Sequence, residues 1–131
     1  MTTATTPALD VQHLAERYFA AWEAHDPDRI VALHTPDTQF QIHTAGTEPV
    51  IGRTHVRDAF ATVFDQFPGY GFETHRLLLG DRHWVLDWTL LSDIGQLGAL
   101  DVVTLDPAGL VARKDTYVEP AELEALFGRA A

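Results

Sequence analysis

The sequence predicts a single α+β domain, with helices first and a run of antiparallel strands after them. Three features support this fold class. The first half carries apolar residues at helical spacing, the second half alternates apolar with polar residues, and short turn sequences separate the alternating segments. A chain of 131 residues fits one domain, and a hydrophobic content of 46% supplies a core that needs no metal or disulfide.

Two consecutive helices are expected after a tail formed by residues 1–7. Thr6-Pro7 resembles a helix start, and apolar residues then recur at helical spacing as far as His25. Asp26-Pro27 repeats the start signal for a short second helix that carries Ile30 and Val31. The two helices form a hairpin with almost no loop.

A strand over 38–43 is predicted next, with Phe40 and Ile42 on one face. Residues 44–52 contain two glycines and a proline and predict a loop. Thr54 is expected to cap a third helix, which Pro68-Gly69 ends.

Four further strands are predicted by alternation, over residues 71–79, 83–92, 99–106 and 110–118. Gly80-Asp81 and residues 107–109 are tight hairpin signals, whereas the connection from Ser92 to Gly98 reads as a looser surface loop. Pro120 opens a short C-terminal helix with Gly128 as its stop.

The composition excludes several classes of partner and cofactor. A net charge of −10 disfavours binding to nucleic acid or to anionic membranes. The chain has no cysteine, and its seven histidines form no metal-binding motif, so neither a metal nor another cofactor is expected. No apolar stretch reaches the length of a membrane span, and the N-terminus lacks the pattern of a signal peptide. We therefore expect a cytoplasmic protein.

Three short segments resemble known motifs, and their order matters more than any one of them. Residues 18–22 followed by His25-Asp26 look like an opening helix and its turn. Residues 52–57 look like a "G-R-x-x-I-R" lead into a third helix, and residues 114–120 look like a last strand that enters an acidic-Pro turn. Over residues 8 to 128 the chain is similar to the nuclear transport factor 2-like superfamily, and within it to the SnoaL-like branch.

This resemblance implies a cone-shaped fold, in which a curved, mostly antiparallel sheet wraps around the N-terminal helices. The branch includes polyketide cyclases, limonene-epoxide-hydrolase-like enzymes are near relatives, and steroid isomerases share the fold. Members are often homodimers that pack the outer face of the sheet. The implied partners are thus a small-molecule substrate or ligand and a second copy of the chain.

Asp87 is the first candidate catalytic residue. It interrupts the apolar strand 84–91, where alternation places it with Val85, Thr89 and Leu91. A carboxylate is costly to desolvate in such surroundings, and burial would raise its pKa toward the range useful for proton transfer. A structural Asp that is paired with a basic residue or exposed on the outer face is the alternative.

Asp115 on the last strand is the second candidate, because strand pairing can bring it near Asp87. Two carboxylates in one dry pocket would separate into an acid and a base. The resemblance to epoxide hydrolases implies a carboxylate pair on these strands. By that resemblance, however, the matching position can also be Thr116, which lies on the opposite face, and Val85 stands where those enzymes carry an arginine. Pairing of Asp115 with Arg113, Lys114 or Arg76 is the structural alternative.

Other residues are expected to assist the two carboxylates. Tyr117 shares a strand face with Asp115 and can orient a substrate oxygen, and Gln41 or His43 can hold a water. A neutral His43 imidazole near the carboxylates can also carry protons. Members of the aromatic set are expected to line an apolar cavity, namely Tyr18, Trp22, Phe60, Phe64 and Trp88.

The leading hypothesis is a cofactor-free enzyme that moves a proton on a small, fairly apolar, oxygenated substrate, in a cyclisation, isomerisation or hydration. Two alternatives remain open. One is a non-catalytic module of the same fold that binds a small ligand or dimerises. The other is an epoxide hydrolase, which would need Arg113 or Arg76 to reach inward.

Overall fold

The computed structural model describes residues 8–127, which form four helices and one six-stranded sheet. The expected tail, residues 1–7, and the expected stop at Gly128 lie outside the described residues. The elements in chain order are α1 (Val11–Glu23), α2 (Pro27–Val31), β1 (His34–Ile42), β2 (Val50–Ile51), α3 (Arg53–Gln66), β3 (Gly71–Leu79), β4 (His83–Ser92), β5 (Gly95–Leu105), β6 (Val111–Val118) and α4 (Pro120–Phe127).

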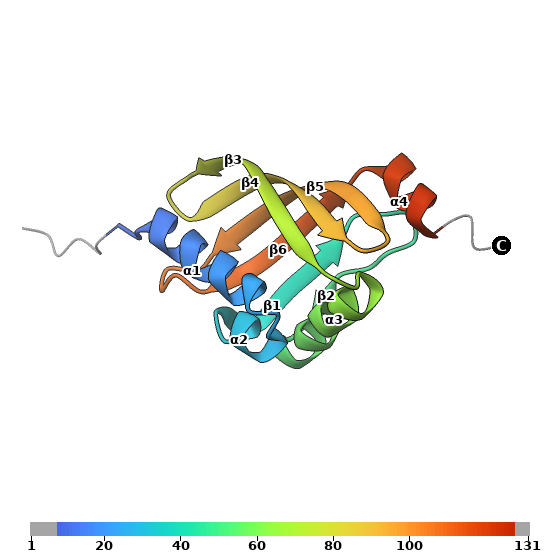
Figure 1. The fold of residues 1–131 in the computed structure, drawn as a ribbon. Coiled ribbons are helices and arrows are strands. Elements are labelled where there is room, and N and C mark those ends of the chain that lie inside the picture. The colour runs from blue at the N-terminus through green and yellow to red at the C-terminus, as the bar shows by residue number, and fades with distance from the viewer. Residues whose placement is uncertain (1–7, 128–131) are drawn as a thin grey trace, which may run out of the picture.

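The sheet has the strand order β2-β1-β6-β5-β4-β3. Neighbouring strands run antiparallel except for β1 and β6, which are parallel. The sheet curves over α1, α2 and α3, which cover one of its faces, while α4 lies at the far end beside β5 (Figure 1). The expected α+β class and the curved, mostly antiparallel sheet are therefore confirmed.

The helix starts follow from capping chemistry. Asp26 caps α2 as expected, because its side chain accepts hydrogen bonds from the backbone N–H groups of Asp28 and Arg29. Helix α1 begins at Val11, where Asp10 accepts from His13 N. The expected cap at Thr54 is wrong: Gly52 precedes α3 with a positive φ of 96°, and no side chain within residues 8–127 caps this helix.

Two strands extend beyond their predicted bounds. Strand β1 begins at His34 rather than at residue 38, and an irregularity in its register between His34 and Gln39 accommodates Pro36. Strand β5 begins at Gly95, so the loop expected from Ser92 to Gly98 is a tight turn in which Ser92 Oγ donates to Gly95 O. Residues 50–51, expected in a loop, form the short edge strand β2.

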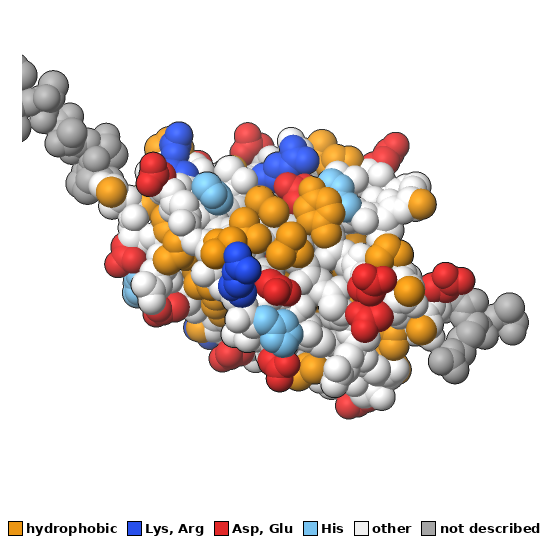
Figure 2. Space-filling view, turned by 90° about the horizontal axis from the view of Figure 1, so that it is seen from above, with side chains coloured by type: hydrophobic (Ala, Val, Ile, Leu, Met, Phe, Trp, Pro, Cys, Tyr) orange, Lys and Arg blue, Asp and Glu red, His pale blue; other side chains and the backbone are white. Residues whose placement is uncertain are grey.

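Strand alternation gives the sheet two chemically different faces. The inner face, toward the helices, carries the buried side chains of β4 at Trp84, Leu86, Trp88 and Leu90. No helix of the described residues covers the outer face, which carries exposed apolar residues such as Leu78 and Leu100 among charged ones (Figure 2). Within residues 8–127, no helix is long and apolar enough to cross a membrane.

Candidate functional site

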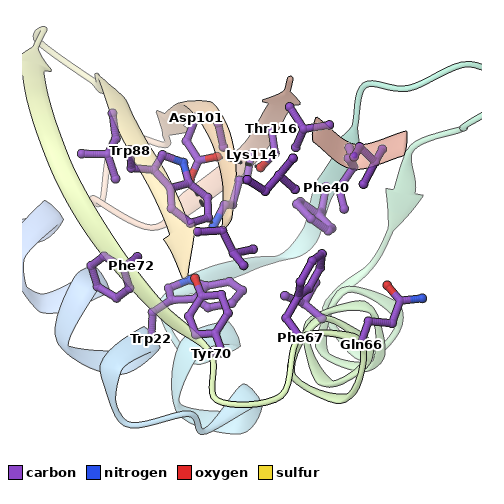
Figure 3. A pocket seen from close by; sticks show the side chains of 18 of the residues that line it. Trp22, Phe40, Gln66, Phe67, Tyr70, Phe72, Trp88, Asp101, Lys114 and Thr116 are labelled. Carbon is purple, nitrogen blue, oxygen red and sulfur yellow. Dashed lines mark hydrogen bonds and ion pairs between the residues drawn. The ribbon is translucent and has the colours of Figure 1, made fainter. Parts of the chain in front are cut away.

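A cavity of about 370 Å³ lies between the inner face of the sheet and the helices. Its walls are mostly apolar and come from α1, α3, α4 and strands β1, β3, β4, β5 and β6. Trp22, Tyr70 and Phe72 form one side, and Trp88 and Phe40 stand opposite (Figure 3). Such a space suits a compact ligand with an apolar body.

Three polar side chains from two neighbouring strands share one part of this cavity. Asp101 on β5 is only 5% exposed, and its Oδ1 accepts a hydrogen bond of 2.8 Å from Thr116 Oγ1 on β6. Lys114 Nζ lies 3.6 Å from Asp101 Oδ2. The pairing Asp101↔Thr116 and the two-residue repeat of β6 bring these side chains to the same face. We call Asp101, Lys114 and Thr116 the inner polar cluster.

Aromatic rings surround the Lys114 ammonium group. Its Nζ lies 4.2 Å from the ring centroid of Trp22, 5.0 Å from that of Tyr18 and 5.4 Å from that of Phe60. Burial lowers the pKa of Lys114, and the neighbouring Asp101 carboxylate opposes this shift only in part. Lys114 therefore gives up its proton more readily than an exposed lysine.

Trp88 adds a hydrogen-bond donor to the same region. Its indole Nε1 is buried, and no group of the described residues accepts its proton. A buried donor without a partner carries a free-energy cost, which an acceptor oxygen on a bound ligand would remove. Trp88 and Asp101 both line the cavity (Figure 3).

A buried hydrogen-bond chain fixes Tyr18 in the cavity wall, near Lys114. Thr38 Oγ1 donates to Val111 O, so it must accept from His34 Nδ1 at 2.9 Å. Nε2 of His34 is then the acceptor for the Tyr18 hydroxyl, also at 2.9 Å. Burial, aided by the charges of Lys114 and Arg53, lowers the pKa of His34 to about 3, which keeps the ring neutral. The Tyr18 proton is therefore not free for a ligand.

The expectation that Asp87 turns into the cavity is wrong. Asp87 is exposed on the outer face, where its neighbours in the strand register are Arg76 on β3 and Leu100 on β5. Its strand does alternate as predicted, but the face with two tryptophans and two leucines offers more apolar area and is the one that the helices cover. Asp87 therefore lies on the far side of the sheet from the cavity.

Asp115 is also on the outer face, so the proposed pair of inward carboxylates does not form. Asp115 accepts hydrogen bonds from His43 Nε2 at 2.7 Å and from Arg113 Nε at 2.8 Å. Its burial alone would raise its pKa, but the bonds from Arg113 and His43 outweigh burial and leave the pKa below its usual value. The structural alternative for Asp115, pairing with Arg113, is the observed one.

The residues expected to assist the carboxylates also lie outside the cavity. The Tyr117 ring stacks on the His43 ring at 4.3 Å between centroids and is 45% exposed. Gln41 on β1 lies opposite Asp115 on β6 in the strand register. Its side-chain amide donates weak hydrogen bonds to Thr47. None of these side chains lines the cavity, whereas Thr116, the open alternative on the last strand, does.

The aromatic residues that were expected to line the cavity fall into two groups. Tyr18, Trp22 and Trp88 line the cavity. Phe60 and Phe64 support the wall from behind, because their ring centroids lie 4.8 Å and 5.3 Å from that of Trp22. They shape the cavity without lining it.

Sequence reasoning missed Asp101 as a candidate. A signal for it existed: Asp101 interrupts the alternating apolar positions Leu97, Ala99, Val103 and Leu105, much as Asp87 interrupts β4. Lys114 was considered only as a partner for Asp115, although it is the only lysine in the sequence. Among residues 8–127, no cluster of three or more His, Asp or Glu side chains is placed to hold a metal ion.

Comparison with models of known protein families identifies the family of this chain. The family model described as the SnoaL-like domain matches residues 15–113, which is most of the sequence. The chain belongs to the SnoaL-like domain family. The matched region runs from Ala15 within α1 through β5 to the first residues of β6, and thus contains most of the cavity wall. Comparison with curated proteins gives no match.

Solved structures share the SnoaL-like fold at low sequence identity. A candidate SnoaL-like polyketide cyclase from Jannaschia sp. CCS1 has a TM-score of 0.79 and 14% identity, covering 100% of both chains. A steroid delta-isomerase from Pseudomonas aeruginosa has a TM-score of 0.75 and 22% identity, covering 93% of this chain and 90% of the other. The epoxide hydrolase/cyclase-like enzyme SalBIII has a TM-score of 0.71 and 19% identity, covering 85% and 92%.

Proposed function

We propose that this SnoaL-like domain is a cofactor-free enzyme that moves a proton on a small, mostly apolar, oxygenated molecule held in the internal cavity. Asp101 is the group that takes or returns the proton. The observation that carries this proposal is a carboxylate, 5% exposed, that lines a mostly apolar cavity beside Lys114. A carboxylate in such a place is suited to act as a general acid or base.

The surroundings of Asp101 assign the other roles. Thr116 holds Oδ1 by its hydrogen bond and leaves Oδ2 directed to Lys114. The unpartnered Nε1–H of Trp88 can donate to the substrate oxygen on which negative charge develops. Aromatic walls exclude water and strengthen these interactions. Loss of a proton beside a carbonyl or enol group, as in an isomerisation or cyclisation, fits this arrangement best.

Two further functions fit the fold less well. An epoxide hydrolase would need a cation between two carboxylates, yet no arginine is among the described residues that line the cavity, and Asp101 is the one carboxylate among them. A module that binds ligand without catalysis would use the same cavity and leave Asp101 as a structural group. Action in the cytoplasm stays a prediction.

The test is hydrogen–deuterium exchange at carbons next to a carbonyl, followed by NMR for a panel of cyclic ketones and lactones in heavy water. We expect the wild-type protein to catalyse exchange for compounds that fit the cavity. Asp101→Asn should slow this exchange by about 10²- to 10⁴-fold, which is the usual contribution of a general base.

Asp87→Asn is the matched control, because it makes the same change on the outer face of the sheet. This variant should exchange at the wild-type rate. Equal rates for Asp101→Asn and the wild type would refute the role of Asp101. Compounds that bind without any exchange would instead support the ligand-binding module.

We also propose that the outer face of the sheet pairs two copies of the chain. Leu78, Leu100 and Tyr117 are 47%, 38% and 45% exposed there, and orange side chains occupy the middle of the face (Figure 2). The Asp115 carboxylate on this face is already paired within the chain, with Arg113 and His43. A second copy would cover the apolar residues without leaving Asp115 unpaired.

A further inference from the structure

Lys114 is the only lysine among the 131 residues, and it is 5% exposed. The other eight basic residues are arginines. Lysine is normally a surface residue and is almost never fully buried unless it is paired. The single amine side chain of this protein is therefore held in the cavity that the proposed function uses.

A purely stabilising role in the fold explains poorly why a lysine occupies position 114. A buried ion pair contributes little net stability, because desolvation offsets the attraction between the charges. Arginine also makes the better structural partner for a carboxylate, since its planar group can form two parallel hydrogen bonds. An arginine cannot lose its proton, whereas a desolvated lysine becomes a nucleophile.

The geometry gives Lys114 the features of an imine-forming amine. Nζ faces the cavity between the rings of Trp22 and Tyr18, and Asp101 Oδ2, the nearest carboxylate oxygen, lies 3.6 Å away (Figure 3). Burial lowers its pKa, so the neutral amine is available at a lower pH than for an exposed lysine. Asp101 is close enough to pass protons to and from the reacting atoms, directly or through one water.

We propose that Nζ of Lys114 forms an imine with the carbonyl group of an aldehyde or ketone bound in the cavity. The inference rests on the proposed function, because it concerns the same cavity and names the substrate as a carbonyl compound. The resulting iminium ion would draw electrons from the neighbouring carbon, and Asp101 would then remove a proton from that carbon.

The steps balance without any other reactant. Lys114 first passes one proton to Asp101, and its lone pair then attacks the carbonyl carbon while the carbonyl oxygen takes that proton. The new amine nitrogen returns a second proton to Asp101, which gives it to the hydroxyl group as that group leaves as water. The nitrogen lone pair forms the C=N bond. The sum is a carbonyl compound plus the ammonium form of Lys114 giving an iminium ion plus water, with Asp101 unchanged.

The test is reductive trapping of the folded protein with benzaldehyde or cyclohexanone and sodium cyanoborohydride, followed by mass spectrometry and peptide mapping. Lys114 and the N-terminal amine are the two primary amines available. We expect the adduct chiefly on Lys114, and its rate of formation should level off below pH 10.5, the ordinary pKa of lysine. An adduct confined to the N-terminal amine, or one on Lys114 that forms only after denaturation, would overturn the inference.

Two variants and one competitor sharpen the result. Lys114→Arg keeps the positive charge and should lose the adduct at this position, and circular dichroism should show that the variant is folded. Asp101→Asn should slow trapping at Lys114. Cyclohexanol, which has no carbonyl group, should compete with cyclohexanone for the wild-type cavity, so adduct formation that cyclohexanol leaves unchanged would contradict the assignment to the cavity.

Failure of this inference is distinguishable from failure of the proposed function. If the wild type catalyses proton exchange that depends on Asp101 but forms no adduct on Lys114, the inference is wrong and the proposed function stands. If the adduct forms on Lys114 while Asp101→Asn exchanges protons like the wild type, the lysine chemistry stands and the role of Asp101 fails.

Discussion

His34 illustrates how burial fixes the protonation state of a single side chain in this SnoaL-like domain. Both ring nitrogens are engaged, with Thr38 on one side and Tyr18 on the other. A second ring proton would have no acceptor, because Nε2 already receives the Tyr18 hydroxyl proton. The neutral His34 ring therefore supports the wall of the cavity at neutral pH. It resists protonation when the pH falls.

This state predicts a specific loss of stability in mild acid. The pKa of His34 is about 3 in the folded protein, against 6.5 for the ordinary side chain. The unfolded chain thus binds more protons between these values, so the free energy of unfolding should fall as pH drops below 6.5. From pH 6.5 to about pH 4.5 the free energy of unfolding should fall by roughly 2 kcal/mol. One proton bound more by the unfolded chain lowers it by about 1.4 kcal/mol for each pH unit.

Urea unfolding at a series of pH values measures this effect. His34→Gln cannot titrate, so its stability should vary less over the same interval, whatever its stability at neutral pH. Asp28 and Asp115 have pKa values below the ordinary 3.8 and lose their contributions at lower pH, outside this interval. An equal pH dependence in the wild type and His34→Gln would refute the account of His34.

At the scale of residues, the sequence predicted a carboxylate within an apolar strand but not which carboxylate faces the cavity. Asp87 and Asp101 both interrupt apolar strands, and a local pattern does not tell which one faces the helices. Lys114 and Thr116 were harder to find, because both faces of β6 carry polar residues. Only the strand pairing Asp101↔Thr116 brings the inner polar cluster together.

At the scale of elements, the prediction of strands was stronger than the prediction of their orientation. Strands β3 and β4 have the bounds that alternation predicted, because tight turns with glycine flank them. The start of β1 was missed because a proline such as Pro36 normally argues against a strand. Here the strand continues past a register irregularity. Strand β2 has two residues, which is too short for a periodic signal.

The face of β4 that turns toward the helices is the one whose side chains carry more apolar surface. On β4 the residues Trp84, Leu86, Trp88 and Leu90 bury far more area than Val85, Thr89 and Leu91 could, and burial stabilises by roughly 25 cal/mol per Å². This comparison would have placed Asp87 outside from the sequence alone. A similar comparison fails for β6, where the inward face carries Lys114 and Thr116.

At the scale of the whole molecule, the cone fold and the family were predictable because they depend on the order of many weak signals. The family model confirms that assignment over residues 15–113. The cavity is a property of the assembled fold, since α1, α3, α4 and five strands contribute to its wall. No single segment contains enough of it to reveal its polar end.

The proposed homodimer predicts a change of mass for one substitution on the outer face. Leu100 is 38% exposed near the centre of the face, between Asp87 and Tyr117 in the strand pairing. Leu100→Glu would place an unpaired charge at an apolar contact, so it should convert a dimer into a monomer. Light scattering after size-exclusion chromatography measures this mass.

Ile51→Glu is the control for that experiment, because Ile51 is 56% exposed at the edge strand β2 and away from the face centre. It should leave the mass unchanged. A wild-type chain that is monomeric at all concentrations tested would contradict the dimer.

The proposed ligand site lies inside the cone beside the inner polar cluster, and tryptophan NMR tests this location most directly. All three tryptophans of the chain, Trp22, Trp84 and Trp88, line the cavity, so their indole N–H signals report on its occupancy. Titration with cyclohexanone should shift the Trp22 and Trp88 signals, because neither indole donor has a partner among the described residues, and should leave the Arg113 Nε–H signal on the outer face in place. Shifts at Arg113 with unchanged tryptophan signals would place the ligand on the outer face and contradict the account.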